Sequence, residues 1–285
     1  MNVGKVRNQG IEVEFDTEVL KAGDFSWSLY GNYATNDNEI LELAQDAQGN
    51  DINLDGGYNA SRVGRSIGAW FLRTYGGVDS NDGRPYWIIG GDETPEEGYS
   101  NEITYSMTAA NQSWVGERIP TYSGGIGTRI NWKGFAVDAN FYFTGGHKIY
   151  ERWGWYSMQT GLLSTRYYQG DQRLLKRWQK PGDVTDVPKM IWSTSTTTSG
   201  SGNSTRFLYD GDFVRLRDLT VSYDLPQSLL GNSGFDRVNF FVKGLNLFTW
   251  TKADLPIDPE IRTNGSWEIY TPILKSISVG ANLKF

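Results

Sequence analysis

The alternation of apolar and polar residues along the chain predicts long β-strands. The last ten residues show it clearly: Ile277, Val279, Ala281, Leu283 and Phe285 alternate with small or polar residues. Because successive side chains of a strand point to opposite faces, this pattern gives one apolar face and one polar face. We therefore expect an amphipathic strand that ends the chain on an aromatic ring.

Six earlier segments show the same alternation and extend this prediction. We expect strands near residues 6–19, 24–38, 121–132, 135–146, 212–225 and 235–247, before a last strand near 272–285. The alternation slips by one residue around Leu216, which predicts a β-bulge. Many of these segments reach the roughly 9–11 residues that a tilted strand needs to cross a bilayer. Strands of soluble proteins are shorter, at about 5–6 residues.

The connections between these strands alternate in length. Short connections are expected at 20–23, 133–134 and 225–234, and long ones at 39–120, 147–211 and 248–271. Transmembrane β-barrels have short periplasmic turns and long extracellular loops, so the alternation favours such a barrel. Aromatic residues near the short turns and the C-terminus predict a belt at the inner membrane surface. The belt would comprise Phe25, Trp132, Phe135, Tyr223, Phe235 and Phe285. The alternative is a soluble β-sandwich.

Composition agrees with an all-β chain and excludes some chemistry. Hydrophobic residues make up 38% of the 285 residues, and no apolar run is long enough for a transmembrane helix. A barrel tolerates this composition because only half of each strand faces lipid. The chain has no cysteine, which excludes disulfides and cysteine nucleophiles, and its net charge of -6 argues against a nucleic-acid partner.

The predicted strands do not form a complete barrel. Bacterial single-chain barrels have an even number of strands, whereas we expect seven here. The first residues, MNVGKVRNQG, also lack the apolar core of a signal peptide. We therefore expect the chain to be the C-terminal part of a larger protein.

Several long motifs carry a family resemblance. They are VGKVRNQGIEVEF at 3–15, IGAWFLRTYGGVDSNDG at 67–83, NWKGFAVDANFYFTGGHKIY at 131–150, RWQKPGDVTDVPK at 177–189, GDFVRLRDLTVSYDLP at 211–226, KGLNLFTWTKADLPIDPE at 243–260, and the closing SISVGANLKF. In this order, over nearly the whole chain, they resemble the C-terminal third of SusC/RagA-type TonB-dependent outer-membrane transporters.

The resemblance implies a function and a set of partners. It implies a plugged barrel of about 22 strands, of which this chain supplies the last seven while the plug domain is absent. It implies import of oligosaccharides or oligopeptides across the outer membrane of a Gram-negative bacterium. The implied partners are a SusD-like surface lipoprotein, the TonB complex through the missing N-terminal part, the barrel-assembly machinery and outer-membrane lipid. No enzymatic activity and no cofactor are expected.

Two groups of residues are the main site candidates. Val279, Leu283 and Phe285 would form the assembly signal of the last strand, unless this is only a closing strand. The loop 147–211 is rich in aromatic residues that could contact cargo or the lid lipoprotein, or simply pack the loop. They are Tyr150, Trp153, Trp155, Tyr156, Tyr167, Tyr168, Trp178 and Trp192. Leu174, Leu175 and Trp178 have the spacing of a short amphipathic helix.

The remaining polar motifs give weaker predictions. The acidic residues Glu12, Glu14, Asp16 and Glu18 share one strand face and would line the lumen, facing either a basic plug surface or solvent. Asp51, Asn53, Asp55 and Gly56 follow the spacing of a calcium loop, but Arg62 stands where a bidentate Glu is needed, so we expect no metal site.

Two other function classes remain open at this point. One is a secreted soluble β-sandwich that binds glycans through its aromatic loops. The other is an outer-membrane hydrolase built around His147, the only histidine. No G-x-S-x-G motif supports the hydrolase, so we expect no catalytic residues.

Overall fold

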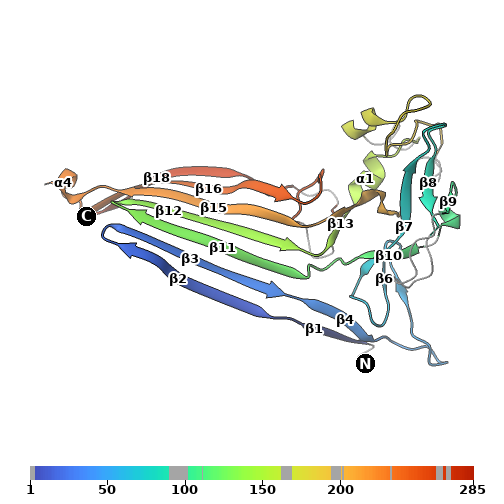
Figure 1. Cartoon of the computed structure of the whole chain (residues 1–285), viewed down its shortest axis with the longest axis horizontal. Helices are drawn as coiled ribbons and strands as arrows, with labels where there is room; N and C mark the ends of the chain where they lie inside the picture. The colour runs from blue at the N-terminus through green and yellow to red at the C-terminus, as the bar shows by residue number, and fades with distance from the viewer. Residues whose placement is uncertain are drawn as a thin grey trace.

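The chain folds into a long curved sheet with a separate group of elements at one end (Figure 1). The computed structural model describes residues 4–89, 102–110, 112–161, 169–193, 200, 202–231, 233–260, 266–267 and 271–285, with the backbone alone at 266–267. Tyr167 and Tyr168 lie outside the described residues.

The long sheet confirms the seven predicted strands. All its neighbouring strands are antiparallel, and their order, β18-β16-β15-β12-β11-β3-β2, is sequential along the chain, apart from strands that belong to other sheets. The strands are β2 (Glu12–Ala22), β3 (Phe25–Thr35), β11 (Tyr122–Trp132), β12 (Phe135–Gly145), β15 (Phe213–Asp224), β16 (Arg237–Thr251) and β18 (Ser276–Lys284). At about 3.3 Å per residue, the eleven residues of β12 extend about 36 Å, enough to cross a bilayer at a tilt.

The first two predicted strands are longer than expected and interrupted. β1 (Lys5–Gln9) pairs with β4 (Asp37–Glu42) as a separate two-stranded continuation of the β2–β3 hairpin. The break falls at Gly10, where an added Cβ would lie 1.9 Å from the Thr35 carbonyl oxygen. Only a glycine allows this close approach of the two backbones.

The predicted bulge lies beside Leu216. Pairing of β12 with β15 jumps from Asn140–Asp218 to Phe141–Leu216, so Arg217 has no partner on β12. The pairing of β15 with β16 shifts at the same place. A bulge sets two successive residues on the same face, and here it keeps Arg217 and Asp218 together on the polar side of the sheet.

The short connections lie at one end of the sheet, together with the C-terminus (Figure 1). Lys133 and Gly134 form a two-residue turn with φ angles of 47° and 87°, the positive values that a tight hairpin of this twist requires. The connection after β15 contains α4 (Gln227–Leu230), a short helix that the alternation did not predict.

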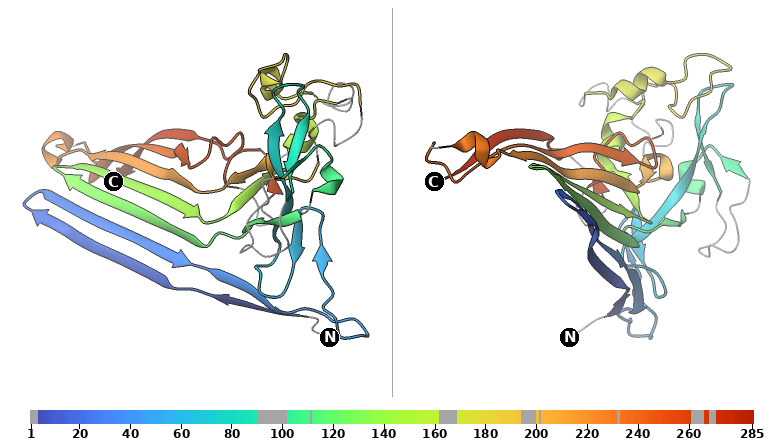
Figure 2. Two further views of the ribbon diagram at one scale, coloured as in Figure 1. Left: turned by 45° about the vertical axis from the view of Figure 1, so that its right-hand side comes forward. Right: turned by 60° about the vertical axis from the view of Figure 1, so that its left-hand side comes forward.

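The long connections fold at the opposite end. They contain β5 (Leu54–Asp55), β6 (Asn59–Ser61), β7 (Ala69–Val78), β8 (Pro85–Ile88), β9 (Ile103–Thr104), η2 (Met107–Ala109), β10 (Gln112–Gly116), β13 (Lys148–Glu151), α1 (Arg152–Ser157), η3 (Gln172–Lys176), η4 (Thr205–Phe207), β14 (Leu208–Asp210) and β17 (Ser266–Trp267). We call the described residues of 43–121 and 146–212 the loop region. Figure 2 shows the loop region standing across the end of the curved sheet.

The loop region has its own hydrophobic core. Its buried members come from the first two long connections, and they are Trp70, Leu72, Tyr150, Met158, Val187 and Phe207. The indole nitrogen of Trp70 donates a hydrogen bond to the Lys148 carbonyl at 2.9 Å, which joins β7 to β13. The two connections therefore form one packed unit rather than separate flexible loops.

Candidate functional site

The long sheet has one apolar face that stays exposed. A single row of paired residues crosses it from strand to strand, formed by Val279, Val242, Val221, Val137, Ile130 and Trp27. Val279 is 78% exposed, Val242 47% and Val221 40%. In water such a surface is unfavourable, by about 25 cal/mol for each Å² of exposed apolar area. The face is suited to an apolar surrounding.

The opposite face carries ion pairs between neighbouring strands. The Arg129 guanidinium donates to Asp138 at 3.0 Å and lies 3.7 Å from Asp16. Lys243 pairs with Asp218 at 2.6 Å. Polar residues on each strand thus find partners across the face, as expected for a wall that meets water.

The acidic residues of β2 lie on this polar face, as the alternation predicted. Asp16 is paired with Arg129, and Glu18 lies 3.7 Å from Lys21 of its own strand. Two of the four charges are therefore already compensated within the chain. Whether Glu12 and Glu14 meet a basic plug surface stays a prediction.

The residues of the predicted assembly signal are all exposed, Val279 and Leu283 on the apolar face of β18 and Phe285 directly after that strand. Val279 pairs with Val242, and Leu283 pairs with Val238 of the neighbouring β16. Phe285 is 80% exposed, and its ring centroid lies 5.0 Å from that of Phe235. The other edge of β18 has no neighbour among the described strands. The role of Val279, Leu283 and Phe285 in barrel assembly stays a prediction.

Aromatic residues lie at both ends of the apolar face. Those at the turn end were predicted, and the Phe135 ring lies tilted against that of Tyr223 there, with centroids 4.3 Å apart. A second group at the loop end was missed; it comprises Tyr33, Tyr122, Phe143, Phe248 and Trp250. Each lies near the loop-side end of its strand, and this shared position in the sequence could have predicted the second group. Membrane proteins place such belts at both interfaces.

The aromatic candidates of the loop 147–211 have different environments. Trp153, Trp155 and Tyr156 lie half-buried on α1, where the Trp155 and Tyr156 rings meet edge to face at 4.5 Å. Trp155 also packs against the hydrophobic core. Tyr150 is only 1% exposed and belongs to that core, whereas Trp192 is 82% exposed. Loop packing therefore accounts for Tyr150.

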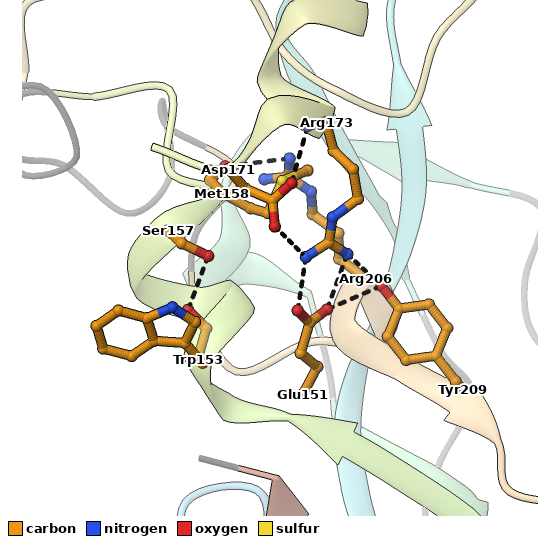
Figure 3. A network of polar contacts seen from close by, with 8 residues as sticks. All are labelled: Glu151, Trp153, Ser157, Met158, Asp171, Arg173, Arg206 and Tyr209. Atoms are coloured by element: carbon orange, nitrogen blue, oxygen red, sulfur yellow. Dashed lines mark hydrogen bonds and ion pairs between the residues drawn. The ribbon is translucent and has the colours of Figure 1, made fainter. Parts of the chain in front are cut away.

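A buried ion-pair network fixes the path of this loop (Figure 3). Arg173 of η3 donates to both carboxylate oxygens of Glu151, at 2.9 and 2.6 Å, and to Asp171 at 2.8 Å. The Tyr209 hydroxyl donates to Glu151 at 3.1 Å. The Glu151 side chain is only 3% exposed, so its charge depends on these partners. The network joins β13, η3 and β14 and was not predicted.

The protonation behaviour of the network follows from its geometry. Burial alone would lower the pKa of Arg173, but its hydrogen bonds to Glu151 and Asp171 outweigh burial and raise it. Burial and the Glu151 charge raise the pKa of Tyr209. Burial opposes ionisation of Asp171, yet the hydrogen bonds from Arg173 hold its pKa below the ordinary value. Both shifts favour the charged forms of Arg173 and Asp171 near neutral pH.

Next to Arg173, a second partly buried arginine hydrogen-bonds to the backbone. Arg206 donates to the carbonyls of Gly200 at 2.7 Å and Met158 at 3.3 Å. Burial lowers its pKa below the ordinary value. The predicted amphipathic helix nearby is the short 3-10 helix η3, which starts after Asp171 and ends before Trp178. Its Leu174 packs on the core.

The remaining polar candidates form local contacts. Asp55 forms an ion pair with Arg62 at 2.7 Å. The positive charge of Arg62 thus stands at the position where a calcium loop needs a carboxylate. Within the described part of the chain, no cluster of three or more His, Cys, Asp or Glu side chains could hold a metal ion. His147 is buried, and burial lowers its pKa despite the nearby charge of Asp212.

Comparison with known proteins gives a consistent result. No protein-family model matches the chain. A "TonB-dependent receptor P3" of Formosa agariphila is 26% identical over 308 residues, covering 100% of this chain and 29% of the relative. A "TonB-dependent receptor P39" of the same organism is 23% identical, with 100% and 31% covered. The predicted resemblance to TonB-dependent receptors is confirmed.

The fold agrees with this resemblance. The structure entitled "Structure of the RagAB peptide transporter" superimposes with a TM-score of 0.80 at 22% identity, covering 100% of this chain and 30% of that one. The 'open-open' state of the RagAB peptide importer gives a TM-score of 0.76 at 23% identity. The chain thus has the fold of a RagA-type barrel segment and spans about 30% of the length of the proteins that it matches. Among the described residues, no helix is long and apolar enough to cross a membrane.

Proposed function

We propose that the chain is the wall and loop portion of a TonB-dependent, SusC-like importer in the outer membrane of a Gram-negative bacterium. Its cargo is an oligosaccharide or an oligopeptide. The observation that carries the proposal is the seven-stranded sheet with an exposed apolar face, an ion-paired polar face, and all long connections at one end. Such a sheet is suited to lipid on one side and water on the other.

Within this proposal each region has a role. The apolar face contacts lipid, the polar face lines the lumen near the plug, and the loop region faces the cell exterior. The proposed contacts for cargo or for a SusD-like lipoprotein are Trp153, Trp155, Tyr156, Tyr167 and Tyr168. Val279, Leu283 and Phe285 present the last strand to the barrel-assembly machinery. Energy reaches the barrel from the TonB complex through the remainder of the protein.

The soluble glycan-binding sandwich is the weaker proposal. A sandwich packs a second sheet against the apolar face of the first, about 10 Å away. In the described residues the apolar face of β18 is instead exposed, with Ile277 at 70% and Val279 at 78%. The fold similarity to a barrel segment also supports the membrane interpretation.

Uptake by cells that carry the complete protein tests the proposal. We expect cells that lack its gene to lose uptake of either a labelled oligopeptide mixture or a labelled oligosaccharide mixture. Inactivation of TonB in wild-type cells should give the same loss, and the protein should fractionate with the outer membrane as a heat-modifiable barrel. Unchanged uptake of both mixtures, or recovery of the protein in the soluble fraction, would contradict the proposal.

A further inference from the structure

The chain after β16 folds back onto the polar face of the sheet. Residues 252–260, which we call the strap, leave the end of β16 with the Lys252 amide donating to the Asp212 carbonyl at 3.0 Å. Further along, the strap contacts β15, where Asp258 and Glu260 pair with arginines of that strand. The strap therefore lies against the same side of the sheet as the lumen-facing ion pairs.

The anchor of the strap is a compact set of charges. The Arg215 guanidinium donates to Asp258 at 2.6 Å and lies 3.3 Å from Glu260. The Arg217 guanidinium donates to Glu260 at 2.6 Å. The Arg215 side chain is 2% exposed and that of Asp258 is 14% exposed. Water therefore cannot solvate either charge in place of its partner unless the strap moves away.

The bulge of β15 explains why the strap is held at this point. Arg215 and Arg217 are two residues apart and share the polar face, and the bulge then keeps Asp218 on that face as well. Asp218 pairs with Lys243 of β16, which leaves both arginines available for the strap. The Arg217 guanidinium also lies over the Tyr142 ring, 4.4 Å from its centroid.

We propose that the strap is a fixed part of the outer mouth of the pore, and that Arg215 and Arg217 are the positioning residues that hold it over the lumen. This inference rests on the proposed function, because it requires the polar face to be the lumen wall. The Arg215 side chain is buried and contacts both carboxylates, so release of the strap would leave a buried charge without a partner, which is unfavourable. The strap therefore narrows the opening permanently, while other elements of the protein must move to admit cargo.

Release of the strap tests its position. In the complete protein, Asp258→Asn with Glu260→Gln removes both negative charges with little change of shape. We expect severalfold greater sensitivity of the cells to a hydrophilic antibiotic that is too large for general porins. The matched control is Asp224→Asn, which breaks the Arg237 pair on the same face but holds no loop. Sensitivity equal to that of the wild type and the control, at normal levels of heat-modifiable barrel, would overturn the proposal.

Locking the strap tests whether it is fixed. Arg217→Cys with Glu260→Cys places two thiols in a chain without other cysteines, and a short bismaleimide then joins them. Uptake of cargo should be the same before and after cross-linking. Uptake that stops on cross-linking would overturn the proposal, because the strap would then move during transport. Failure of the proposed function is distinguishable, since it appears as absent uptake by the wild-type protein, whereas antibiotic entry is measured without cargo.

Discussion

The long sheet and the loop region reach stability in opposite ways. The sheet exposes its apolar residues, such as Val279 at 78%, and pairs its charges in the open. The loop region buries Trp70 and Leu72 completely and encloses the Glu151–Arg173 pair. The loop region thus encloses a hydrophobic core, whereas the sheet leaves its apolar face uncovered. This difference supports the proposed function, in which the sheet meets lipid and the loop region meets water.

The largest expected effect comes from the loop core. Trp70→Ala removes a fully buried indole and its hydrogen bond to Lys148, which costs about 3–5 kcal/mol of the stability of the loop region. We expect rapid proteolysis of the loop region in the assembled complete protein, while the barrel remains heat-modifiable. The exposed Trp192→Ala is the control. Simultaneous loss of the barrel would show that the two regions are not independent.

Placing a charge on the apolar face of the sheet tests whether that face contacts lipid. Leu219 pairs with Ala139 and Gly244 on this face, midway between the two aromatic groups. Leu219→Arg should destabilise the barrel in lipid vesicles by about 2–4 kcal/mol, because the guanidinium would lie near the bilayer centre. Urea unfolding of the reconstituted complete protein measures this loss. The neighbouring Thr220 points to the polar face, so Thr220→Arg should cost far less. Equal losses for both variants would refute the assignment of faces.

Substitution of Phe285 distinguishes two roles of this residue, as a contact of the last strand and as an assembly signal. Its ring lies tilted against that of Phe235, a contact that contributes about 0.5–1.5 kcal/mol. Phe285→Ala should therefore change the stability of the folded barrel only slightly. As an assembly signal, however, its loss should lower the amount of folded protein in the outer membrane severalfold. Immunodetection of heat-modifiable barrel gives the answer, with Phe235→Ala as the control for the lost contact. Normal amounts in the Phe285→Ala variant would leave only the closing role.

The smallest expected effect is a dependence of the loop region on acidity. The folded-state pKa of Asp171 lies below its ordinary value, since Arg173 outweighs the effect of burial. Its stabilising contribution is therefore present above about pH 4 and is lost as the pH falls through the folded-state value. Hydrogen exchange in residues 169–177 should increase below pH 4. Asp171→Asn should remove this part of the dependence, and an unchanged acid response in that variant would contradict the assignment.

The sequence predicted the sheet far better than the loop region. Each strand has a local period of two, so the alternation alone placed Val279 and Leu283 on the apolar face, without information on the neighbouring strands. The core of the loop region joins Trp70, Tyr150 and Phe207, which are far apart in the chain and follow no common period. The Arg173–Glu151 network was missed for the same reason, because its partners are 22 residues apart.

The aromatic candidates show the limit of composition as a signal. Tyr150 and Trp192 belong to one aromatic-rich segment, yet one is buried and the other is exposed. Residue type indicated a surface for binding, but only the packing of distant segments decides which rings are accessible. The helix α4 was missed because its four residues are too few to show a helical period.

The closure of the first long connection has a consequence for how such chains diversify. Residues 36–121 leave β3 at Thr35 and return to β11 at Tyr122, which are paired in the sheet, and the Asn36 amide donates to the Thr121 carbonyl at 2.8 Å. The insertion is therefore joined to the wall at two adjacent anchor points, and beyond them by the pairing of β4 with β1. Doubling the length of a flexible insertion adds only about 0.6 kcal/mol of closure entropy. Selection can exchange or enlarge the outer segment while the hairpin beneath it keeps its register.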